Sequence, residues 1–328
     1  MISFCCPPST QDSIKDSPVF AALSALADIV FLDNSEILEE YHTKHRSMTD
    51  SVYLALRHAR TCPGHTVLVF LNPDVIVSRE LFPSIADAMG RGKKALMMTG
   101  LRTRVDQVCN LMEPYRKNLA LDIAGSDLSR IAMDNLHPYC SGFIWNRESF
   151  PASNPAIVLF ETKDRGLLQH CFHLHPIAMV CPETLPVTQD TVDGDFLEKS
   201  GLKGDDFEVV NNGEGAVVIE MSGEPYEHPD RLRPRSRRRV AEFAIKASDT
   251  HYNFFWQRID FARDVTTERN EHELERLLRY IKVHEPRRRL RQKYPKLDRR
   301  LFRQYFRVKA WLVTLSWPRL NRFRRSSG

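Results

Sequence analysis

The chain has 328 residues, of which 42% are hydrophobic, so it can bury a substantial core. It contains no apolar run near the roughly 20 residues that a membrane-spanning helix needs, and its first residues lack the pattern of a signal peptide. Its seven cysteines are odd in number and show no CxxC spacing, which argues against a disulfide framework. We therefore expect a cytoplasmic protein.

The net charge of +5 is unevenly distributed. Residues 285–328 contain 15 Lys or Arg against Glu285 and Asp298, and removing this charge of +13 leaves residues 1–284 at −8. The asymmetry predicts an acidic domain at 1–284 and a basic tail at 285–328. We do not expect a general nucleic-acid-binding protein.

Short apolar runs alternate with helical periods in the first hundred residues. The predicted elements, in chain order, are a strand at 28–32, a helix between Ser47 and Pro63, a strand at 67–71, a helix between Ser78 and Gly90, and a strand at 95–98. This order is typical of a parallel sheet, and an uninterrupted apolar run such as 67–71 suits a central strand covered on both faces. The pattern predicts an α/β fold with a mostly parallel sheet.

Later segments are less regular. The predicted strands are 141–145, 156–160, 173–180 and 216–220, and the predicted helices are one that carries Leu274, Leu277 and Ile281 and one at 297–315 in the tail. The tail helix combines an apolar and aromatic side with Arg and Lys elsewhere.

Asn72-Pro73-Asp74 follows the central strand directly. In parallel sheets ligands bind beyond the carboxyl ends of the strands, and a carboxylate there can hold a divalent cation shared with a nucleotide diphosphate. The alternative is that Asp74 only forms a turn after Pro73.

The segment from Lys44 to Asp50, the helix after it and the run from Val67 to Ser78 resemble the nucleotide-sugar half of glycosyltransferase A enzymes. In that family a central strand runs into an Asp-x-Asp motif, whereas Asn72 here leaves Asn-x-Asp. The resemblance covers about residues 25–180. It implies a Rossmann-like sheet of glycosyltransferase A type and a Mn²⁺ or Mg²⁺ cofactor at Asp74.

The resemblance also implies contacts to a nucleotide-sugar donor. We expect Lys44 and Arg46 to meet phosphate at a helix N-terminus, and the small residues Ser141 and Gly142 to allow close approach beside Trp145. The alternatives are a solvated basic loop and a buried strand with a glycine bulge.

Cys171, His173 and His175 alternate in sequence, and on a strand they would share one face. Some enzymes of the resembled family complete their metal site with a distal histidine, so His173 or His175 carries over by analogy. A zinc site from Cys171, His173, His175 and Cys181 is one alternative. A half-buried strand with hydrogen-bonded histidines is the other.

Sugar transfer needs a base for inversion or an ion-pair route for retention. The late acids Glu183, Asp193 and Asp195 are the candidate catalytic residues, the last two in a loop-like segment. Solvated loop acids are the alternative.

The expected function is transfer of a sugar from a nucleoside diphosphate sugar to a glycan or lipid-linked acceptor. The basic amphipathic tail suits an anionic membrane surface, although it can instead pack on the acidic body. Nucleotidyl transfer is a second enzymatic alternative, but no Gly-rich phosphate loop is visible. A catalytically silent domain that acts as a membrane-surface adaptor is an alternative of another class.

Overall fold

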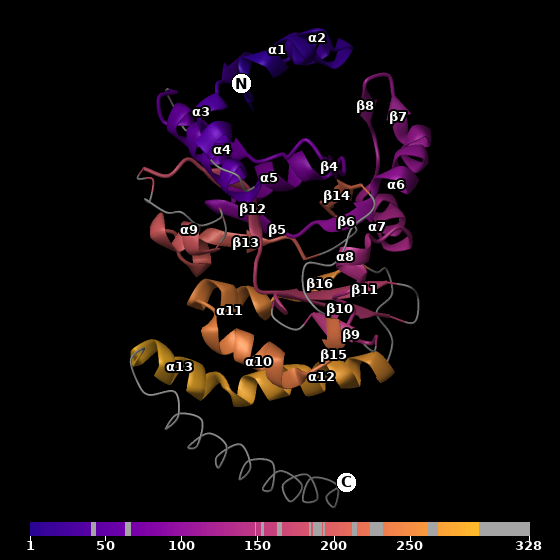
Figure 1. Ribbon diagram of the computed structural model, residues 1–328, viewed down its shortest axis with the longest axis vertical. Coiled ribbons are helices and arrows are strands. Elements are labelled where there is room, and N and C mark those ends of the chain that lie inside the picture. Colours follow the sequence, from indigo (N-terminus) through magenta and orange to yellow (C-terminus); the bar gives the residue numbers. More distant parts are fainter. Residues whose placement is uncertain are drawn as a thin grey trace, which may run out of the picture.

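Figure 1 shows the computed structural model of the chain. The described residues are 1–40, 44–62, 67–147, 149–151, 154–162, 166–183, 185, 192, 194–211, 215–223, 232–261 and 268–294. For residues 38–40, 44–48, 194–195 and 268–271 only the backbone is described. The N-terminal elements lie at one end of the molecule in this view, and the last described helices lie at the other.

The chain begins with a strand that the sequence analysis does not predict. β1 (Ile2–Cys5) pairs in parallel with β2 (Ile29–Leu32), which confirms the strand predicted at 28–32. α1 (Pro8–Lys15) and α2 (Pro18–Ser24) connect them. Each helix starts at a proline, whose missing N–H is not needed in a first turn.

The two helices predicted in the first hundred residues are confirmed. α4 (Lys44–Ala59) follows α3 (Ser35–Glu40) and buries Leu56 and Ala59, while α5 (Leu81–Gly90) buries Leu81 and Ile85. These residues recur at helical spacing, so one side of each helix faces the core. α4 begins before Ser47, the first residue of the predicted helical segment.

The main sheet is mixed rather than mostly parallel. Its order is β13 (Phe207–Val209), β5 (Ala95–Met98), β12 (His175–Val180) and β3 (Val67–Val69). β12 is antiparallel to both β3 and β5, and β13 is parallel to β5. The prediction of a mostly parallel sheet is therefore wrong, because a late strand is inserted between two early ones in the reverse direction.

Two further sheets each have three strands among the described residues. In one, β14 (Val218–Ser222) lies between β4 (Val75–Val77), to which it is antiparallel, and β6 (Leu101–Arg104), to which it is parallel. In the other, β11 (Leu167–Cys171) lies between β10 (Ile157–Glu161) and β16 (Ile259–Asp260), both antiparallel to it. β10 and β14 confirm the strands predicted at 156–160 and 216–220.

The remaining described elements surround these sheets. Two small antiparallel pairs are formed by β7 (Arg116–Lys117) with β8 (Ala120–Leu121) and by β9 (Ser149–Pro151) with β15 (Leu232–Pro234). The other helices are α6 (Val105–Met112), η1 (Glu113–Tyr115), α7 (Gly125–Asp134), α8 (Pro138–Ser141), α9 (Gly194–Lys199), η2 (Gly204–Asp206), α10 (Arg237–Lys246), α11 (Asp249–Phe255), α12 (Glu268–Val283) and α13 (Glu285–Lys293). α12 confirms the predicted helix with Leu274, Leu277 and Ile281. The helix predicted at 297–315 lies outside the described residues.

Residues 141–145 do not form the predicted strand. Ser141 is the last residue of α8, a turn follows it, and only Ile144 makes an isolated bridge, to Leu159. The short helix begins at Pro138 and includes the first residue of the predicted strand.

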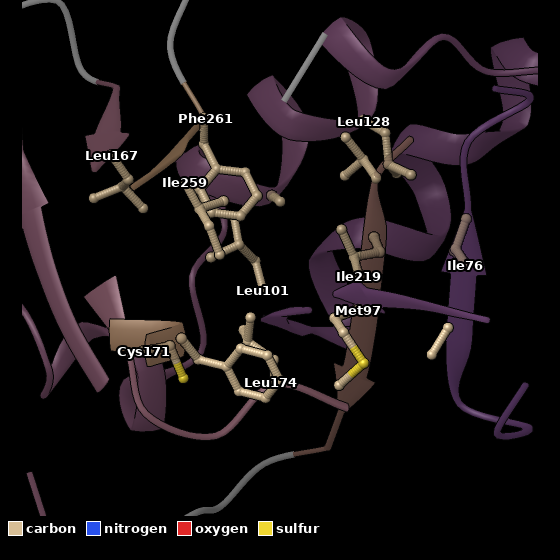
Figure 2. Packing of buried hydrophobic residues seen from close by; sticks show 14 of the residues in the cluster. Ile76, Met97, Leu101, Leu128, Leu167, Cys171, Leu174, Ile219, Ile259 and Phe261 are labelled. Atoms are coloured by element: carbon tan, nitrogen blue, oxygen red, sulfur yellow. The ribbon is translucent and has the colours of Figure 1, made fainter. Parts of the chain in front are cut away.

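The core consists of three clusters of buried side chains. The first joins all three larger sheets and includes Met97, Leu101, Cys171, Ile219 and Ile259 (Figure 2). The second packs the sheet of β10 and β11 against the C-terminal helices, and the third lies under α5. Each fully buried Leu or Phe contributes about 1.5–3 kcal/mol, so these contacts fix the strand ends that carry the candidate site.

Candidate functional site

The candidate site lies at one edge of the main sheet. Since β12 is antiparallel to both of its neighbours, β3 and β5 run in the same direction, and β13 runs with them. Their carboxyl ends therefore meet at one edge, together with the amino end of β12. Asn72, Asp74, Thr99, His175 and Asn211 are polar residues at or just beyond these strand ends.

The strand register places His175 between the other strand ends. Ala178 pairs with Val69, and the Phe70 N–H donates to the Ile177 carbonyl over 2.9 Å. A register shift in β12 between Pro176 and Ala178 ends this regular pairing before His175. On its other side His175 pairs with Met98, the last residue of β5. The structure thus brings two residues from the predicted donor and metal sites to the same edge.

Asn72 and Asp74 form a turn through their backbones. The Val75 N–H donates to the Asn72 carbonyl over 3.2 Å, and the Met221 N–H donates to the Asp74 carbonyl over 2.7 Å. Asn72 is exposed and Asp74 half-buried, and neither side chain has a hydrogen bond or ion pair with another described residue. The backbone of Asn72 to Val75 therefore forms the turn that was the alternative prediction. This turn does not use the side chains of Asn72 and Asp74, so both can still contact a ligand.

The prediction that Cys171, His173 and His175 share one strand face is wrong. Cys171 ends β11, His175 begins β12, and His173 lies in the turn between them. The Cys171 Sγ donates to the His173 carbonyl over 2.9 Å, and burial raises the pKa of this thiol to about 12, so it stays protonated.

The two histidines also have different surroundings. The His173 ring packs against the rings of His251, at a centroid distance of 4.4 Å, and Phe243, at 5.9 Å. The exposed His175 places its Nδ1 3.2 Å from the Val192 carbonyl oxygen. Among the described residues no group of three or more His, Cys, Asp or Glu is arranged to hold a metal, which leaves the four-ligand zinc alternative without a described site.

Ser141 and Gly142 have local structural roles. The Ser141 hydroxyl donates to the Pro138 carbonyl over 3.0 Å, and the Gly142 N–H donates to the same carbonyl. Phe143 and Trp145 are 3% and 2% exposed, so they offer no aromatic surface to a ligand. The expectation that the nucleotide-sugar donor lies against Trp145 is therefore wrong, because this ring is buried.

Glu183 is not brought beside the other candidates. It is exposed and follows β12, whose carboxyl end lies beside Val67 at the amino end of β3. That end is the opposite edge of the sheet from Asn72. The sequence position just after a strand suggested an active-site acid, but the reversed direction of β12 places it on the other side.

The remaining predicted site residues are described only in part. Lys44 and Arg46 belong to the first turn of α4, and Asp195 belongs to the first turn of α9. Only the backbone of these residues is described, and Asp193 lies outside the described residues. Their roles stay predictions.

The structure adds an ion pair that sequence reasoning missed. Glu220 of β14 lies opposite Val75, the neighbour of Asp74, and its carboxylate contacts the Arg102 guanidinium at 2.5 Å. Arg102 also stacks on the Tyr139 ring at 4.8 Å. Both charged side chains are half-buried. No sequence signal links them, because they are 118 residues apart.

Comparisons with families, curated proteins and solved structures found no match. No helix within the described residues has both the length and the apolar character to cross a membrane.

Proposed function

We propose that this protein is a glycosyltransferase that takes a sugar from a nucleoside diphosphate sugar. The observation that carries the proposal is the carboxyl end of β3, where Asn72 and Asp74 present side chains without described partners at the sheet edge that also carries the start of β12. This edge is where open α/β sheets bind nucleotides. The glycosyltransferase A type of fold belongs to the same proposal.

A divalent cation is the proposed cofactor. Asp74 supplies a hard anionic oxygen, Asn72 an amide oxygen, and His175 an imidazole nitrogen from the neighbouring strand. Such a set is too small to hold Mg²⁺ or Mn²⁺ by itself, but Mg²⁺ is commonly bound by one or two carboxylates together with substrate phosphates. The donor diphosphate would therefore complete the site, which makes metal binding dependent on the nucleotide.

The half-buried Glu220 and Arg102 extend the proposed site towards β14. Glu220 offers a second carboxylate near the turn that contains Asp74. The motif itself has only one carboxylate, because Asn72 stands in place of its first acid. The Arg102 guanidinium holds its orientation and offsets its charge. We propose these two residues, with Asp193 and Asp195, as the groups to test for a role near the acceptor hydroxyl.

The proposed acceptor is a glycan or lipid-linked molecule, met at an anionic membrane surface from the cytoplasmic side. Six exposed cations of α12 and α13 support this proposal, and we name them the basic helical surface: Arg276, Arg279, Lys282, Arg289, Arg291 and Lys293. Between residues 276 and 293 the chain has eight Lys or Arg and a single acid, Glu285. The sequence 295–328, with ten Lys or Arg and one acid, Asp298, follows directly.

A catalytically silent adaptor is the second candidate function. Asn72 favours it, because an amide supplies no charge for a cation. The basic helical surface is compatible with both the transferase and the adaptor. Binding of a nucleotide-sugar donor is what distinguishes the two functions.

The deciding experiment measures thermal stability of the full chain against a panel of nucleoside diphosphates and nucleotide sugars, with and without Mn²⁺. A ligand that binds only the folded state raises the apparent Tm. We expect a Mn²⁺-dependent shift with one nucleotide and its loss in Asp74→Ala, with the ligand-free Tm almost unchanged because the Asp74 side chain has no described partner. Asn72→Asp should enlarge the shift, since it restores a carboxylate.

Asp16→Ala is the matched control, because Asp16 is an exposed acid between α1 and α2 that has no ion pair with another described residue. A shift that survives Asp74→Ala would reject the site assignment. Absence of any shift in the unmodified chain would reject the transferase and favour the adaptor.

A further inference from the structure

A polar side chain, that of Gln169, lies among the buried residues of the first apolar cluster and bonds to Thr99 just beyond β5. Gln169 of β11 is 1% exposed, and its Nε2 donates to Thr99 Oγ1 over 3.0 Å. Thr99 is the first residue after β5. Figure 2 shows Leu167 and Cys171, the neighbours of Gln169 on the same strand face, in one cluster with Met97 and Leu101. The amide thus bridges two sheets through apolar surroundings.

Only one end of the Gln169 amide has a described hydrogen bond. Its Nε2 donates to Thr99 Oγ1, whereas Oε1 is buried without a hydrogen-bond partner among the described residues. The neighbouring Cys171 Sγ donates to the His173 carbonyl instead.

This arrangement costs stability. A buried amide oxygen without a partner loses its hydration and gains nothing in return, so a side chain such as Met would suit the cluster better. Orphaned buried polar atoms call for an explanation, and a role in the neighbouring site is one.

The bond from Gln169 decides what the Thr99 hydroxyl can do. Its oxygen accepts from the amide, so its own hydrogen is left to donate, and it donates to no other described residue. Thr99 is half-buried and stands next to Met98, the partner of His175. The hydroxyl therefore lies as a donor at the carboxyl end of β5, on the sheet face of Met97, whereas His175 is opposite Met98 on the other face.

We infer that Thr99 is a ligand-binding residue whose hydroxyl donates to an oxygen of the bound nucleoside diphosphate, and that Gln169 is the positioning residue that aims it. This inference rests on the proposed function and adds to it a hydrogen-bond donor that carries no charge. Gln169 acts only through Thr99, so the two side chains form one functional unit.

The test measures the affinity of the full chain for Mn²⁺ with the nucleoside diphosphate that gives the largest thermal shift from a panel of the uridine, guanosine, adenosine and cytidine forms. Thr99→Val, which keeps the shape and removes the hydroxyl, should weaken binding about tenfold. Gln169→Met should weaken binding similarly while raising the ligand-free Tm. The double variant should bind no more weakly than Thr99→Val alone, because both changes remove one interaction.

Gln107→Met, at an exposed position of α6, is the matched control and should leave the affinity unchanged. Independent, additive losses in the double variant would overturn the positioning role, and an unchanged affinity in Thr99→Val would overturn the binding role while the proposed function stands. A normal chain that binds none of the nucleotides would overturn both this inference and the proposed function.

Discussion

Among the described Lys, Arg, Asp and Glu side chains, only that of Arg288 is buried, at 4% exposure. Its guanidinium contacts the Asp249 carboxylate and lies over the Tyr252 ring at 4.2 Å. Hydrogen bonds from Arg288 and then Gln292 hold the pKa of Asp249 below its usual range, although partial burial opposes them. One arginine thus ties α13 to α11.

We predict that Arg288→Ala lowers the free energy of unfolding by roughly 2–3 kcal/mol, because it removes a buried stem, a cation–π contact and an ion pair. Chemical denaturation of the full chain measures this loss. The neighbour Arg289 is the control: its side chain is 73% exposed, and among the described residues its ion pair is with Glu285 of the same helix. Arg289→Ala should cost less than about 0.5 kcal/mol. Equal losses in the two variants would contradict the role given to burial.

At the scale of elements, α13 is the link between the body and the basic tail. It packs against α10 and α12, and Figure 1 shows the three helices together at one end of the described chain. It begins at Glu285, the first residue of the segment that the charge pattern assigns to the tail.

We expect two truncations to differ. A chain that ends at Tyr294 keeps α13 and should keep the Tm of the full protein. A chain that ends at His284 loses the Arg288 contacts, so its Tm should fall by roughly 5 °C or more, given about 2–4 °C per kcal/mol for a domain of this size. Thermal melts of both forms test this. If the shorter form melted with the full chain, α13 would have no part in the fold.

Sequence patterns predicted the helices and strands themselves better than the order and direction of the strands within the sheets. The apolar spacing in α4, α5 and α12 and the uninterrupted runs in β3 and β5 depend on neighbouring residues, so they are readable locally. The position of β12 is not, because its pairing joins residues 67–69 with 178–180. Local patterns likewise gave no reason to expect a strand at β11, where Gln169 and His170 interrupt the apolar residues.

At the scale of the molecule, strand pairing between distant segments also explains why only some of the site residues were predicted correctly. Asn72 and Asp74 could be placed beyond a strand end from their own segment. Glu183 was misplaced because the direction of β12 decides which edge it reaches. Thr99 and Gln169, which are 70 residues apart, carry no shared pattern at all. Site residues that come from different sheets become visible only when the sheets are assembled.

The charge asymmetry of the whole chain leads to the last prediction. Each Lys or Arg near an anionic bilayer contributes about 1 kcal/mol, and this attraction falls off within a Debye length. The basic helical surface should therefore bind phosphatidylglycerol vesicles together with the sequence 295–328. Replacing Arg289, Arg291 and Lys293 by Gln should lower the partition coefficient roughly tenfold or more at low salt. Co-sedimentation of the full chain measures it.

The matched control replaces Arg116, Lys117 and Arg130 by Gln, because these exposed cations lie on β7 and α7, away from the C-terminal helices (Figure 1). This variant loses the same charge and should bind as the normal chain does. Equal losses in both triple variants would mean that net charge alone drives binding. If vesicles of neutral phosphatidylcholine bound the chain equally well, apolar insertion would replace electrostatics as the cause, since the basic helical surface gains nothing from a neutral headgroup.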